Sequence, residues 1–122
     1  MSLLRLEVTQ TGGVVNKADD HVLWVSVADD QGKPVTDLKT NNFKVATLQK
    51  AIPTAADIEV EFAHPKYGGF YEVRVRPSSG NTWEQGQYVL GLTAHRATLV
   101  TFYPPQLLGS DDGQALVRVS VT

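Results

Sequence analysis

The chain contains no cysteine, so no disulfide can join its strands and no thiolate can hold a metal ion. It also lacks an apolar run of about 20 residues, the length that a helix needs to cross a membrane, and we expect no membrane insertion. The opening residues, MSLLRLEV, lack the charged region, apolar stretch and cleavage site of a signal peptide. These absences leave the compartment of the protein open.

The charge balance is close to even, with 11 Lys and Arg, 13 Asp and Glu, and a net charge of −2. Because a nucleic-acid-binding surface needs clustered positive charge, we expect no nucleic acid partner. Hydrophobic residues make up 42% of the chain and charged residues 20%, a composition typical of folded globular proteins. A length of 122 residues predicts a single domain over residues 1–122.

Motifs with catalytic content are also missing. The sequence has no H-E-x-x-H, G-x-S-x-G, P-loop or G-x-G-x-x-G pattern. Its three histidines, His21, His64 and His95, have no second ligand-type residue at a metal-binding spacing. We therefore expect a protein that is not an enzyme.

The chain has many short segments in which apolar and polar residues alternate. This period of two is typical of strands that bury one face. No helical period of apolar residues is sustained over a useful length. Turn-forming residues separate the segments, which favours an antiparallel sandwich. The predicted strands are Leu4–Thr9, His21–Ala28, Ile58–Phe62, Phe70–Arg76, Gly86–Ala94 and Ala115–Val121.

One stretch, Trp83–Thr93, organises this pattern. Tyr88, Leu90 and Leu92 alternate with polar or small residues, and Gly86 lies two residues before the tyrosine. The spacing resembles the tyrosine corner of immunoglobulin-like sandwiches, in which a Tyr at the start of strand F hydrogen-bonds to the backbone just upstream. The alternative is a glycine turn followed by an ordinary amphipathic strand.

A second segment, Val22–Val45, carries a more extended resemblance. It is similar to the V-x-V-x-D-x-x-G-x-P-V-x-x-L…F-x-V pattern of bacterial immunoglobulin-like domains, through Val25, Val27, Asp29, Gly32, Pro34, Val35, Leu38, Phe43 and Val45. The resemblance implies an all-β, immunoglobulin-like antiparallel β-sandwich of seven to eight strands with a long F–G connection. It also implies a non-catalytic accessory or spacer domain of a larger bacterial surface or exported protein. The partners would then be other proteins or neighbouring domains.

The stretch His95–Gly113 departs from a minimal immunoglobulin-like domain, where a hairpin loop of about 2–5 residues is expected. It is apolar, with Pro104-Pro105 in its middle. One interpretation is an extra strand, Ala97–Tyr103, at a sheet edge or as an extension of the F–G hairpin. The other is a surface for a protein partner or a homodimer, formed by Phe102, Tyr103, Leu107 and Leu108.

Trp24 should point outward, because Leu23 and Val25 beside it have the period of a core face. An outward Trp could belong to the partner surface, lie beneath the stretch His95–Gly113, or stack on a sugar. The rival function is therefore a carbohydrate-binding module that uses exposed Trp and Tyr residues, with Trp24 or Trp83 as the main platform.

Paired aspartates occur in two loops that meet at one end of an immunoglobulin-like sandwich. Asp29 and Asp30 lie in one loop, and Asp111 and Asp112 in the other. Four carboxylates at one end could hold Ca²⁺. The alternative, which we favour, is two ordinary solvated turns, because neither pair belongs to a spaced ligand motif. No cofactor is otherwise expected.

Overall fold

The protein is described from a computed structural model that covers residues 2–100 and 106–122, with side chains at residues 3–96 and 111–122. This part of the chain contains no α-helix. Two single turns of 3₁₀ helix occur, η1 (Thr40–Asn42) and η2 (Ser78–Gly80). The strands are β1 (Ser2–Leu3), β2 (Arg5–Thr9), β3 (His21–Ala28), β4 (Phe43–Gln49), β5 (Ile58–Pro65), β6 (Phe70–Pro77), β7 (Gly86–Val100) and β8 (Gln106–Val121).

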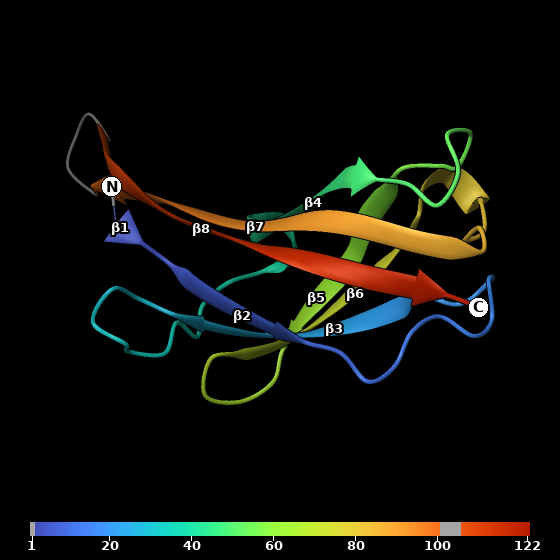
Figure 1. Cartoon of the computed structure of the whole chain (residues 1–122). Helices are drawn as coiled ribbons and strands as arrows, with labels where there is room; N and C mark the ends of the chain where they lie inside the picture. The colour runs from blue at the N-terminus through green and yellow to red at the C-terminus, as the bar shows by residue number, and fades with distance from the viewer. Residues whose placement is uncertain (1, 101–105) are drawn as a thin grey trace.

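The eight strands form two sheets that pack face to face (Figure 1). Sheet A has the order β1-β8-β7-β4, and sheet B has the order β2-β3-β6-β5. All pairings between these strands are antiparallel except that of β1, which runs parallel to β8 through Ser2 and Leu3. The predicted all-β sandwich of seven to eight strands is confirmed.

The core lies between the sheets and follows the alternation in the sequence. Each predicted core face on the central strands is buried: Leu23, Val25, Tyr71, Val73, Val75, Tyr88, Leu90 and Leu92 are all 0% exposed. Because successive side chains of a strand point to opposite faces, the residues between them form the outer faces of the two sheets.

Phe62, which the alternation of the predicted strand Ile58–Phe62 would place with Ile58 on the core face, lies outside the core. The pairing of β5 with β6 shifts between Val60 and Phe62, which marks a β-bulge. The extra residue turns Phe62 to the outer face, where the Arg74 guanidinium carbon lies 5.5 Å from the centre of its ring. Ala63 is buried in its place, at 6% exposure.

The predicted hydrogen bond of Tyr88 is present. The backbone N–H of Glu84 donates to the Tyr88 hydroxyl at 2.9 Å, and the tyrosine is fully buried. Gly86, with a φ of +132°, makes the bend between them in a region that disfavours side chains. The Trp83 ring packs edge-on against Tyr88, with ring centres 5.1 Å apart.

The stretch His95–Gly113 extends the hairpin of β7 and β8. The pairing of these strands runs from Gly86 opposite Val121 to Val100 opposite Gln106. Since β4 pairs with β7 only as far as Ala94, the hairpin continues past the rest of the sandwich as a two-stranded ribbon (Figure 1). The predicted extension of the hairpin is confirmed as far as Val100, and residues 101–103 of the predicted strand Ala97–Tyr103 lie outside the described ones. The last strand begins at Gln106 rather than at Ala115.

Candidate interaction surface

The outer faces of the two sheets differ in chemistry. On sheet B, charged side chains are paired with one another: Arg76 lies 3.1 Å from a Glu61 oxygen, and Arg74 donates to Glu72 at 2.8 Å. The hydrogen bond from Arg74 lowers the pKa of the Glu72 carboxyl. A face covered by paired charges is well solvated, and such pairs contribute little to stability.

The outer face of sheet A carries exposed leucines among polar side chains such as Thr93, Gln114 and Arg118. Ala46, Gly91 and Leu116 lie side by side in one row across β4, β7 and β8. Leu116 is 74% exposed and Leu48 is 59% exposed. Leu3 of β1, opposite Asp112 and 57% exposed, is on the same side of the sheet. We call the surface formed by Leu3, Ala46, Leu48, Gly91 and Leu116 the leucine face.

Two of the three positions in the row Ala46, Gly91 and Leu116 have small residues. A Cβ on Gly91 would lie 3.4 Å from the Leu48 side chain, so Leu48 leans across the glycine. Leu116 stands on one side of this position and Ala46 on the other. The face therefore has a projecting side chain over β8 and a low area over β4.

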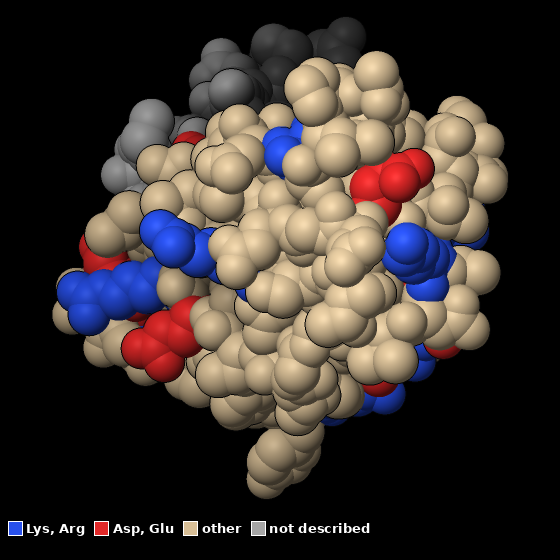
Figure 2. All heavy atoms as spheres, turned by 45° about the vertical axis from the view of Figure 1, so that its right-hand side comes forward, with Lys and Arg blue, Asp and Glu red and all other residues tan. Residues whose placement is uncertain are grey.

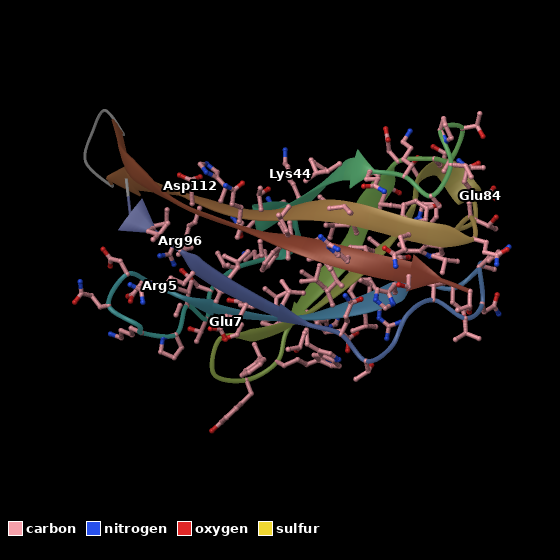
Figure 3. All side chains as sticks on the ribbon, viewed as in Figure 1. Arg5, Glu7, Lys44, Glu84, Arg96 and Asp112 are labelled. Atoms are coloured by element: carbon pink, nitrogen blue, oxygen red, sulfur yellow. The ribbon has the colours of Figure 1, made fainter. Side chains whose placement is uncertain are left out.

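Polar side chains surround the leucine face. Lys44 points away from the sandwich on β4, as Figure 3 shows. Asp112 on β8 accepts a hydrogen bond from His95, its cross-strand neighbour on β7. Beside this pair, a groove of about 750 Å³ opens where the chain leaves β1 for β2, lined in part by Leu3 and Leu6.

The base of the ribbon is fixed on its inner side by one arginine. Arg96 donates to Asp111 on β8 at 2.6 Å and to Asp37 in the loop before η1 at 2.5 Å. The hydrogen bond with Asp111 raises the pKa of Arg96, so the guanidinium stays charged. Figure 3 shows Arg96 on the side of the hairpin that faces sheet B. The arginine thus ties both strands of the hairpin to the sandwich.

Of the aromatic residues predicted as a sugar platform, Trp83 lies in the core. Trp83 is fully buried, and its indole N–H donates to the Asp19 carbonyl at 2.9 Å. Tyr71 is also fully buried. The prediction that Trp83 is an exposed sugar-stacking residue is wrong, because the ring fills the end of the core beside Tyr88. Trp24 does point outward, on sheet B between Thr9 and Glu72, and is half-buried.

The predicted partner residues are only partly described. Phe102 and Tyr103 lie outside the described residues. Leu107 and Leu108 belong to β8, and their side chains lie outside the described ones as well. The described part of His95–Gly113 runs in sheet A, whereas Trp24 is on the outer face of sheet B. That part of the stretch therefore does not cover Trp24.

Three of the four aspartates proposed for Ca²⁺, namely Asp29, Asp111 and Asp112, use their carboxylates for contacts within the protein. The Asp29 carboxylate accepts the backbone N–H groups of Gln31 and Lys33, both at 2.9 Å, which closes a turn. The backbone carbonyl of Asp30 is 3.5 Å from Arg5. Asp111 pairs with Arg96, and Asp112 with His95. Across residues 2–100 and 106–122, no group of three or more metal-binding side chains occurs.

The three exposed leucines were not recognised from the sequence as a surface. Leu116 lies between Ala115 and Val117, so the period of two alone places it opposite the core. Leu3 and Leu48 come from two other strands, and only the strand order brings them to the same side. A signal existed for Leu116, but none for the leucine face as a whole.

Comparisons with known proteins gave no match to this chain among family models, curated proteins or solved structures. No helix in the described ranges has the length and apolar character that a membrane span requires. Figure 2 shows acidic and basic side chains dispersed over one end of the molecule, with uncharged surface between them. That end therefore carries no concentrated positive patch, and the leucine face remains the strongest candidate site.

Proposed function

We propose that the chain is a non-catalytic protein-interaction module that presents the leucine face to a partner. The observation that carries this proposal is the exposure of three leucines on one side of one sheet: Leu3, Leu48 and Leu116. An apolar patch that brings together several strands marks an interaction site more often than a scatter of single exposed residues does. On the outer face of sheet B, the apolar side chains Trp24 and Phe62 are half-buried, and Arg74 lies over the Phe62 ring.

The strand order supports an immunoglobulin-like domain as the scaffold. Sheet B, with the order β2-β3-β6-β5, corresponds to strands A-B-E-D, and β4, β7 and β8 correspond to C, F and G. The bond from Glu84 to Tyr88 agrees with the tyrosine corner of that fold. We propose on these grounds that the chain is an accessory or spacer domain of a larger bacterial surface or exported protein.

The positions of the chain ends fit a spacer. β1 lies at the end of the sandwich from which the ribbon projects, and the end of β8 lies at the opposite end (Figure 1). Modules joined through such ends can form an extended row while the faces of their sheets stay open to partners. The proposal therefore combines two roles, spacing along the chain and binding through sheet A.

A photo-reactive amino acid placed at residue 116 tests this function in cells that make the protein. Residue 15 is the control, because Val15 is 83% exposed and follows Val14, which pairs with Val121 at the end of β8, about 17 Å along the strand from Leu116. We expect a cross-linked product from position 116 that position 15 does not give. Equal products from both positions, or none from position 116, would contradict the interaction module.

A further inference from the structure

We infer that the partner of the leucine face is a second copy of this chain, packed face to face about a twofold axis that runs along β7. This inference rests on the proposed function and names the occupant of its surface. Its first support is the shape of the row Ala46–Gly91–Leu116. A twofold axis along the middle strand places β8 of one copy over β4 of the other.

The two sides of the row complement each other in size. The axis brings the projecting Leu116 of each copy onto the low area at Ala46 of the other. The contact occurs twice in one interface, as an isologous dimer requires. Leu48, which leans across Gly91, closes the centre between the two contacts. Packing of this kind would remove the most exposed leucine of sheet A from water.

The charges around the face also complement each other. Lys44 is opposite Thr93 on β7, and Asp112 is opposite His95, two residues further along the same strand. The axis brings β4 of one copy over β8 of the other. Measured along the strands, Lys44 of one copy is then offset by about 7 Å from Asp112 of the second copy. A lysine side chain spans this distance. Each dimer would contain two such pairs.

The size of the face predicts a weak dimer. β4 has seven residues, so the part of sheet A that is three strands wide is about 24 Å long at about 3.4 Å per residue. At about 4.8 Å per strand this part offers about 340 Å² per copy, below the roughly 800 Å² of a standard interface. Interfaces below the standard size belong to weak or transient associations, so we expect a weak and reversible dimer.

Sedimentation at graded concentrations tests the dimer with three proteins. The wild-type chain should change from monomer to dimer between about 1 and 100 μM. Leu116→Glu places a charge at the centre of the interface and should weaken association at least tenfold. Val15→Glu makes the same kind of change on an exposed residue elsewhere and should associate as the wild type does.

Folding is checked separately, because Leu116→Glu must retain the cooperative unfolding transition of the wild type. Ala46→Arg serves as a second variant, since it blocks the low area from the other side of the row. Either variant should leave a folded monomer. A wild type that stays monomeric throughout this range would overturn the inference, as would equal association of the Leu116→Glu and Val15→Glu variants. A monomer that still cross-links from position 116 in cells would overturn only the second copy as partner, and the interaction module would stand.

Discussion

Two buried tyrosines show how single hydroxyl groups fix segments that have no partner strand. The Tyr71 hydroxyl donates to the Val35 carbonyl at 2.7 Å and accepts from the Leu38 N–H at 3.1 Å, which holds the loop before η1. The Tyr88 hydroxyl accepts from the N–H of Glu84 and holds the entry to β7. Burial raises the pKa of Tyr71, so this hydroxyl stays protonated and continues to donate.

Removing the Tyr88 hydroxyl should therefore destabilise the fold. We expect Tyr88→Phe to lower the free energy of unfolding by about 1–3 kcal/mol, because the Glu84 N–H would lose its partner in a partly buried site. Denaturant unfolding measures this loss. Tyr67→Phe is the control, since Tyr67 is 88% exposed and its hydroxyl is in water. Equal stability of the wild type and the Tyr88→Phe variant would disprove the structural role of this bond.

His21 makes the fold sensitive to pH. The side chain is 6% exposed, bonds to Gln10 at 2.6 Å and packs edge-on near Trp83. Burial lowers its pKa, so the folded chain binds a proton less readily than the unfolded chain, whose His pKa is about 6.5. Below that value the unfolded state binds more protons at this residue, and this contribution to stability falls as the pH falls.

We accordingly expect the free energy of unfolding to decrease as the pH is lowered from about 7 towards 5. His21→Gln keeps a polar side chain at this position but cannot be charged. Its stability should depend less on pH over the same interval than that of the wild type. Unfolding curves of both proteins at matched pH values measure the difference, and parallel pH profiles would contradict it.

The residues that sequence reasoning placed correctly are those governed by alternation. Leu23 and Leu90 follow the period of their strands and are fully buried. Trp83 precedes β7 and belongs to no alternating run, so nothing local indicates that it fills the core. Phe62 follows the period but is turned outward by the bulge in β5. A bulge depends on pairing with β6, which the sequence of β5 alone does not specify.

At the scale of the element, the hairpin of β7 and β8 has two parts. Up to Ala94 it has a third strand, β4, beside it. Arg96 then ties its base to Asp37 and Asp111, and beyond this point the pairing continues without β4. The sequence predicted a long connection with a strand as one alternative. The sequence does not predict how β7 pairs with β8 in this stretch. The register of the pair shifts between Thr98 and Leu99, and Pro104-Pro105 suggests a loop.

The ribbon should be dispensable for folding. Arg96 and Asp111 lie opposite each other, so an Asn-Gly turn of type I′ can replace residues 97–110 and join the two strands directly. Among the described strand pairings, only that of β7 with β8 involves this segment. We expect the free energy of unfolding to change by less than about 1 kcal/mol. Loss of the cooperative thermal transition in the shortened protein would show that the ribbon supports the sandwich.

For the whole molecule, the contrast between the sheets is the main result. Sheet B carries paired charges on its outer face, such as that of Arg76 with Glu61, beside the half-buried Trp24 and Phe62, and sheet A has the leucine face. The sandwich could be predicted from alternation and turn residues. The leucine face could not, because it depends on the order of four strands and on the row that aligns Ala46 with Leu116. Non-local pairing of this kind leaves no periodic signal in a single strand.

The most direct measurement uses the absence of cysteine from the natural chain. Ala46→Cys and Leu116→Cys are made as separate proteins, mixed at about 100 μM and oxidised. Within one copy these positions are two strand spacings apart, about 9.6 Å, and between copies the proposed axis brings them together. We predict a disulfide-linked dimer that forms rapidly in the mixture and only slowly in either protein alone. A mixture that cross-links no faster than the separate proteins would contradict the association of two copies through the leucine face.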